Sequence, residues 1–148
     1  MRLREVSRIE RPPDAVWARV IDPASFRQWN DKVVSMDVGG EFRIGQPFTT
    51  HYRWKGKEMQ CLSVVTALVP GRLLEIRHSQ PVGEKLAGGL EVTERIRLTQ
   101  RGGDTIVRKD IVIRHHDVPW FLLPLIWFVS WFGTPVGPDR LKALCEES

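Results

Sequence analysis

The sequence predicts an α+β fold in which a curved antiparallel sheet of six to seven strands wraps around a long C-terminal helix, with two short helices after the first strand. Short segments of alternating apolar and polar residues, bounded by Gly and Pro, fill the middle of the chain and are typical of strands with one buried face. A Gly102-Gly103 turn joins two of them, and an apolar stretch follows at 118–132. The length fits one domain, residues 1–148.

The N-terminal region predicts a strand followed by two short helices. Residues 3–10 alternate loosely and end at Pro12-Pro13, and residues 14–21 carry apolar side chains at helical spacing. Proline is tolerated at a helix start because the first amides have no partner within the helix. Asp22-Pro23 ends this helix, and a second one is expected from Pro23 to Trp29.

Four strands are expected next, over residues 33–38, 48–54, 59–69 and 73–79. Alternate residues of a strand share a face, so Phe48, Thr50, Tyr52 and Trp54 lie on one side, and this aromatic side is expected to face inward. By the same alternation, Leu74, Ile76 and His78 share one face of the fourth segment.

A hairpin from Leu90 to His115 is the most fully determined unit. With Gly102-Gly103 as a two-residue loop, the opposed pairs are Arg95 with Asp110, Glu91 with Arg114, Val92 with Ile113, Leu98 with Val107, and Arg97 with Arg108. Two of these are opposite-charge pairs on one face and two are apolar pairs on the other, and only the arginine pair is a mismatch. A helix from about Pro119 is expected to break near 133–138 and to resume at 139–145.

Charge and motif content exclude several function classes. The net charge is +4, but Arg and Lys alternate with other residues and form no block, so no nucleic-acid partner is expected. Cys61 and Cys145 lack metal-ligand spacing, and no phosphate loop or nucleophile motif is present, so no metal and no cofactor are expected. The first residues contain no apolar run, which favours a cytoplasmic protein. The segment 118–132 is shorter than the roughly twenty residues that a spanning helix needs.

The order of elements resembles the START-like superfamily with its helix-grip fold, also called SRPBCC, in particular the polyketide cyclase/dehydrase and lipid-transport branch. The resemblance covers nearly the whole chain and is carried by Ile9, Pro12-Pro13, Val16-Trp17, Asp22, Trp29, Gly40 to Gly45, Val65 to Pro70, Leu74, Leu141-Lys142 and Glu146. It implies a cavity between the concave face of the sheet and the C-terminal helix. It supplies no catalytic residue, because the superfamily shares no catalytic motif.

Two charged residues are expected among apolar neighbours on the inner face of the hairpin. Glu94 shares a face with Val92 and Ile96, and Lys109 shares one with Val107 and Ile111, and the two lie diagonally across the strands. A buried charge is costly unless it is paired, so each is expected to serve the other or a ligand. Two interpretations stay open, namely an internal ion pair and a catalytic pair of base and carbonyl-polarising ammonium. His78, near the pocket mouth, is either a third proton-transfer candidate or a satisfied strand-end histidine.

These residues define the expected ligand site and three functional hypotheses. The expected ligand-binding residues are Trp29, Phe48, Tyr52, Trp54, Ile76, His78, Val92, Glu94, Lys109, Trp120 and Trp127. The leading hypothesis is binding, carriage or sensing of a small hydrophobic molecule such as a lipid or an aromatic metabolite. The alternatives are a cofactor-independent cyclase, dehydratase or isomerase that uses Glu94, Lys109 or His78, and a membrane-surface or protein-interaction factor that acts through residues 118–132. A homodimer through the same apolar helix is also expected, because a helix that is apolar on every side must be covered on every side.

Overall fold

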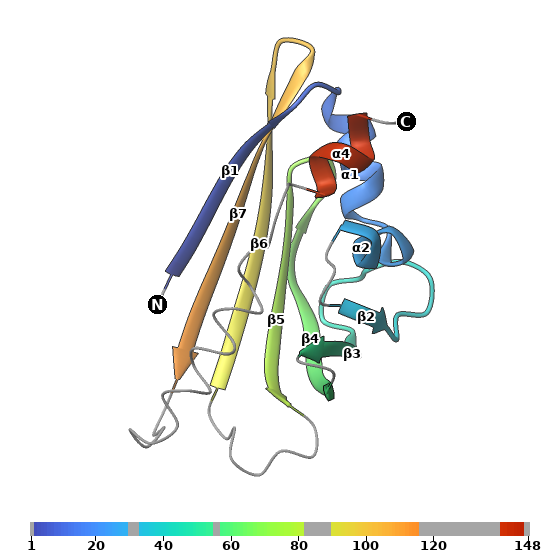
Figure 1. Cartoon of the computed structure of the whole chain (residues 1–148), viewed down its shortest axis with the longest axis vertical. Helices are drawn as coiled ribbons and strands as arrows, with labels where there is room; N and C mark the ends of the chain where they lie inside the picture. Colours follow the sequence, from blue (N-terminus) through green and yellow to red (C-terminus); the bar gives the residue numbers. More distant parts are fainter. Residues whose placement is uncertain (1, 30–32, 55–56, 82–89, 116–139, 147–148) are drawn as a thin grey trace.

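The computed structural model describes residues 2–29, 33–54, 57–81, 90–115 and 140–146. Its elements are β1 (Arg2–Ile9), α1 (Pro13–Val20), α2 (Pro23–Trp29), β2 (Val33–Met36), β3 (Pro47–Trp54), β4 (Lys57–Val69), β5 (Leu73–Pro81), β6 (Leu90–Arg101), β7 (Asp104–His115) and α4 (Arg140–Glu146). The strands form one antiparallel sheet in the order β1-β7-β6-β5-β4-β3-β2 (Figure 1). The predicted α+β fold with two short helices after the first strand is confirmed. The predicted helix from Pro119 lies outside the described residues.

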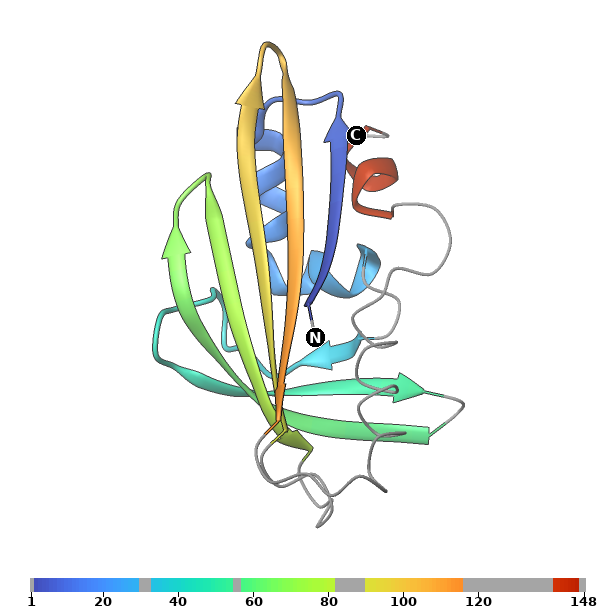
Figure 2. The ribbon, with the colours of Figure 1, turned by 90° about the vertical axis from the view of Figure 1, so that its left-hand side faces the viewer.

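The sheet is strongly curved. Figure 2 shows β3 and the start of β4 running across the direction of β1, β6 and β7, with α1 and α2 on the side toward which the sheet bends. The register between β4 and β5 shifts twice, between Cys61 and Leu62 and between Val65 and Ala67. Such irregularities bend a strand and increase its local twist, which accounts for the change of direction along β4.

Local sequence explains the two N-terminal helices. The backbone is extended at Pro12 and becomes helical at Pro13, where α1 begins. Val16 and Val20 lie four residues apart on one face of this helix, and both are fully buried. Asp22, predicted to end the first helix, also starts the second. Its carboxylate accepts a hydrogen bond from the Ala24 amide at 3.0 Å and another from the Ser25 hydroxyl at 3.0 Å, as an N-terminal capping residue does.

The register of the β6–β7 hairpin is the one that the sequence predicts. All five opposed pairs are confirmed, including the mismatch of Arg97 with Arg108. The salt bridges seen for these residues, however, reach the strand on the other side of each one. Arg95 donates to Glu75 on β5 at 2.6 Å, and Asp110 accepts from Arg4 on β1 at 2.8 Å. Glu91 pairs with Arg77 of β5 at 3.3 Å, while the side chain of Arg114 lies outside the described part. Each strand has a second neighbour in the sheet, and these long side chains reach toward that neighbour.

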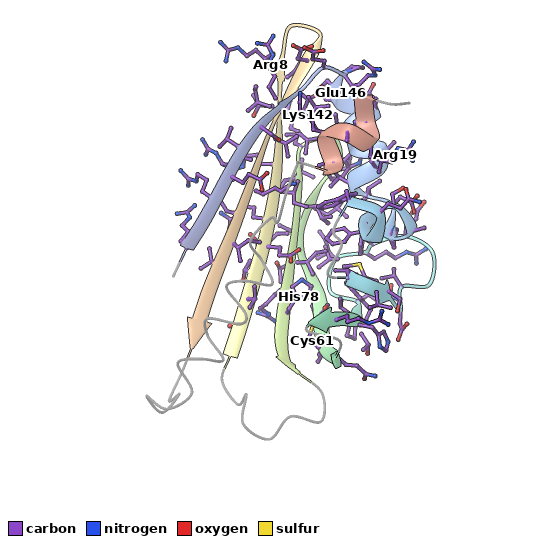
Figure 3. The ribbon with its side chains drawn as sticks, in the orientation of Figure 1. Arg8, Arg19, Cys61, His78, Lys142 and Glu146 are labelled. Atoms are coloured by element: carbon purple, nitrogen blue, oxygen red, sulfur yellow. The ribbon has the colours of Figure 1, made fainter. Side chains whose placement is uncertain are left out.

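The last described helix, α4, docks at the end of the sheet where β1 meets α1. Leu141 and Cys145 are buried there, and the Lys142 ammonium donates to the Arg8 carbonyl at 2.7 Å. Glu146 accepts from the backbone amide of Glu10 at 2.8 Å, and Figure 3 shows Arg8, Lys142 and Glu146 gathered at this end. Among the described helices, none has the length and hydrophobicity needed to cross a membrane.

Candidate functional site

A row of buried polar side chains crosses the inner face of the sheet over four neighbouring strands. Thr50 of β3, Ser63 of β4, His78 of β5 and Glu94 of β6 are all at most 6% exposed. The hydroxyls of Thr50 and Ser63 lie 2.8 Å apart, and the Ser63 hydroxyl lies 2.6 Å from Nδ1 of His78. The row is therefore a connected chain of hydrogen bonds that ends at the imidazole ring.

The far side of this ring faces a carboxylate. Nε2 of His78 lies 3.7 Å from Oε1 of Glu94, which is close enough for an ion pair but too long for a hydrogen bond. Nε2 is buried and has no hydrogen-bond partner within the described part of the chain. Figure 3 places His78 beside Cys61, whose sulfur lies 3.7 Å from Nδ1.

The neighbours of His78 favour its charged form. Burial alone would lower the pKa of His78, but the contact with Cys61 and the negative charge of the nearby Glu94 carboxylate outweigh burial and raise this pKa from 6.5 to about 10. The raised pKa favours the imidazolium at neutral pH, in which both ring nitrogens are donors. Nδ1 shares its hydrogen bond with the Ser63 hydroxyl, and in this form Nε2 carries an N–H on the side of the Glu94 carboxylate.

Lys109 lies beside an aromatic ring that the sequence did not predict as its neighbour. Its ammonium lies 5.1 Å from the centre of the Trp29 ring, a cation–π arrangement that joins β7 to α2. Glu94, expected to serve Lys109 or a ligand, pairs with His78. The indole nitrogen of Trp29 is buried and, like Nε2 of His78, has no hydrogen-bond partner within the described ranges.

An aromatic cluster borders the polar row. Phe26 contacts Trp29 with ring centres 4.4 Å apart, and Phe42 lies 6.2 Å from Phe26 and 5.7 Å from Phe48. Phe48 is directly opposite Ser63 in the register, so the cluster reaches the strand that carries the polar row. The described part of the inner face is therefore mostly apolar, and most of its buried polar side chains lie in this row.

The predicted site residues fall into three groups. The structure buries Trp29, Phe48, Ile76, His78, Val92 and Glu94, and leaves Lys109 partly buried. Tyr52 and Trp54 lie on β3, but their side chains are not among the described ones, and Trp120 and Trp127 lie outside the described residues. Cys61 and Ser63 are site residues that were not predicted. Alternation within 59–69 places both on the face of Val65, and that signal could have identified them.

Two other features bear on the chemistry. Within the described ranges, no group of three or more His, Cys, Asp and Glu side chains is arranged to hold a metal ion. A groove of about 560 Å³ lies at the turn between β4 and β5, and Pro13, Leu73 and Arg97 are among the residues that line it. None of the residues of the polar row lines this groove.

The fold is START-like, as comparison with solved structures shows. A START superfamily protein from Mycobacterium smegmatis superposes with a TM-score of 0.68 at 11% identity, covering 99% of this chain and 97% of the other. Protein MLL2253 from Mesorhizobium loti gives 0.70 at 16% identity, covering 100% and 98%. DynU16, from the dynemicin biosynthetic locus, gives 0.63 at 20% identity, covering 98% of this chain and 47% of the other.

Sequence comparison narrows this class to a family. The family model described as "Activator of Hsp90 ATPase homolog 1-like protein" matches residues 10–112, which is more than two thirds of the chain. This protein therefore belongs to the AHSA1 family. The search of curated proteins finds no match to the chain.

Proposed function

We propose that this protein binds a small apolar molecule on the inner face of its sheet. The observation that carries the proposal is the composition of that face, on which aromatic and aliphatic side chains surround a polar row that includes a buried nitrogen without a partner in the described part. Ligand pockets in proteins are typically apolar walls with a few placed polar groups. The START-like fold is consistent with this proposal.

The energetic cost of the polar row supports a role in binding. A buried polar group without a hydrogen bond costs roughly 1–3 kcal/mol relative to a satisfied one. An apolar residue of similar size at position 78 or 94 would avoid this cost. The polar row is therefore expected to have a partner that the described residues do not provide, and a bound ligand is such a partner.

Native mass spectrometry and a panel of fluorescent lipids and polyaromatic compounds test the proposal. At least one class of apolar compound should bind with one-to-one stoichiometry. Val92→Phe, which adds volume on the inner face, should weaken uptake at least about tenfold. Thr93→Phe, one residue along β6 and on the outer face, is the matched control and should bind normally. The proposal is wrong if no compound binds the wild-type protein, or if both variants bind equally well.

A second candidate function is acid–base catalysis in the same place, and the pairing of His78 with Glu94 favours it. A histidine held by a hydroxyl on one nitrogen and faced by a carboxylate on the other is suited to moving a proton. The reaction would be a cyclisation, dehydration or isomerisation that needs no cofactor. Bound compounds can be recovered and compared with the starting material by chromatography and mass. Glu94→Gln should then retain binding and lose conversion, whereas unchanged compounds from the wild-type protein would leave only the binding function.

We further propose that the segment 118–132 makes an intermolecular contact. A homodimer is the first expectation and a membrane surface the second. Sedimentation at micromolar concentration tests the dimer, and a monomer in the absence of detergent would contradict it. Co-sedimentation with liposomes tests the membrane contact, which Trp127→Asp should abolish.

A further inference from the structure

The gap between His78 and Glu94 has a geometry that selects one kind of chemical group. Nε2 presents an N–H, Oε1 presents lone pairs, and the two atoms are 3.7 Å apart. An oxygen atom can lie about 2.8 Å from Nε2 and from Oε1 at the same time, because these two atoms are only 3.7 Å apart. One group can therefore hydrogen-bond to both atoms. That group must accept from the imidazolium and donate to the carboxylate.

Only an amphiprotic group meets both requirements. A carbonyl, an ether or a carboxylate oxygen can accept from Nε2, but it turns lone pairs toward the carboxylate of Glu94 and is repelled. A hydrocarbon leaves both atoms unsatisfied in a buried position, which is costly. A hydroxyl accepts and donates through the same oxygen.

The ring is held in the orientation that this bridge needs. Nδ1 is fixed by the Ser63 hydroxyl at 2.6 Å, and that hydroxyl is in turn fixed by Thr50 at 2.8 Å. Ser63 and Thr50 are both completely buried, so water does not compete for these bonds. A donor that is oriented before a ligand arrives loses little entropy on binding.

We propose that the ligand of this protein is an apolar alcohol or phenol whose hydroxyl bridges Nε2 of His78 and Oε1 of Glu94. The proposal rests on the proposed function, because it names the ligand class for the same inner-face site. The hydrocarbon body of the ligand then lies against the aromatic cluster of Phe26, Trp29, Phe42 and Phe48.

Matched pairs of compounds test the proposal. The probes are 2-naphthol with 2-methoxynaphthalene, and 1-dodecanol with its methyl ether, so that ring and chain scaffolds are both represented. In the wild-type protein, the hydroxyl member of at least one pair should bind at least about tenfold more tightly than its ether, since hydrogen bonds to charged groups are the strong ones. Dissociation constants are measured by calorimetry at pH 7.

Variants separate the hydroxyl bridge from a steric effect of the ether methyl. The preference for the hydroxyl is the dissociation constant of the ether divided by that of the hydroxyl compound. In Glu94→Leu this ratio should fall close to one. In Glu94→Gln, which keeps an oxygen acceptor without the charge, the ratio should be intermediate. Glu91→Gln removes a carboxylate from the outer face of the same strand and should keep the full preference. Circular dichroism verifies that each variant is folded, and Glu94→Gln alone decides the test if Glu94→Leu does not fold.

The outcomes distinguish this inference from the proposed function. Equal affinity for hydroxyl and ether in the wild-type protein overturns the inference, assigns the gap to a water molecule and leaves the binding function standing. A preference that persists unchanged in the Glu94 variants also overturns it, because a steric effect would then explain the difference. If none of the four probes binds and the panel of lipids and polyaromatics also fails, the proposed function itself is wrong.

Discussion

His78 carries a charge in the interior, and its immediate neighbours determine whether that charge is stable. A buried imidazolium is costly unless a carboxylate faces it, and Glu94 supplies that carboxylate at 3.7 Å. The two residues are therefore dependent on each other, and removing either one leaves an unpaired charge or an unsatisfied donor. Ser63 and Thr50 add hydrogen bonds on the other nitrogen, so the ring has a single orientation.

The raised pKa of His78 predicts that the protein loses stability as the pH rises above neutral. The folded-state pKa of about 10 exceeds the ordinary value of 6.5, so the native state binds the proton more tightly than the unfolded chain does. The stabilisation is complete below pH 6.5 and is lost as the pH rises toward 10. One such group lowers the free energy of unfolding by at most about 1.4 kcal/mol per pH unit.

Urea denaturation at pH 6.5, 7.5 and 8.5 measures this slope. In His78→Gln, which cannot take up the proton, the slope should be much smaller than in the wild-type protein. A wild-type stability that stays constant or increases over this pH range would contradict a charged His78. The same slope in both proteins would assign the effect to other groups.

The β6–β7 hairpin is the element that organises the inner face, because it carries Glu94 and Lys109. Its turn has a positive φ of 63° at Gly102, while Gly103 has an ordinary backbone conformation. A positive φ at the first loop position only is the pattern of a type II′ turn, which matches the twist of the strands. The turn therefore fixes the register that brings Glu94 to the inner face.

Two glycine substitutions test the role of this turn. A Cβ added at either Gly102 or Gly103 meets no atom within 4 Å, so any cost comes from the backbone alone. Gly102→Ala should reduce the free energy of unfolding by about 1–2 kcal/mol, the cost of a left-handed conformation for a residue with a Cβ. Gly103→Ala is the matched control and should be neutral or slightly stabilising. Equal effects of the two changes in chemical denaturation would show that the turn conformation does not limit stability.

Local signals account for what the sequence could predict. The helix Pro23–Trp29 and the hairpin register follow from proline, glycine and short-range patterns, and the structure confirms both. The ion partners of Arg95 and Glu94 could not be predicted, because the pattern fixes where a side chain starts but not which neighbour a long side chain reaches. The contact of Ser63 with His78 depends on register shifts between β4 and β5, and strict alternation contains no signal for such shifts.

In the whole molecule, the end of the chain returns to its beginning. Helix α4 packs against α1, α2 and β1, so residues far apart in sequence close one end of the sheet. Leu141 is fully buried in this contact, and Lys142 and Glu146 bind backbone groups of Arg8 and Glu10. Through this contact the C-terminus can influence the stability of the entire fold.

Leu141→Ala is therefore expected to destabilise the whole protein and not only the last helix. Truncation of a fully buried leucine costs about 2–5 kcal/mol. Ala143→Ser, on the exposed side of the same helix, is the control and should change stability by less than about 0.5 kcal/mol. Thermal and urea denaturation should each give one shared transition for Leu141→Ala. A separate early transition, or no loss of stability, would show that α4 is only loosely attached.

The arginines of β1 have a consequence for how copies of this protein meet. β1 is an outermost strand among the described ones, and strands at such borders carry backbone N–H and C=O groups that could pair with a strand of another molecule. Exposed guanidinium groups at Arg2, Arg4 and Arg8 line this strand, and a strand added there would have to displace their water. Such charges are a common protection of sheet borders against polymerisation. The border formed by β1 is therefore protected against uncontrolled growth of the sheet into fibres.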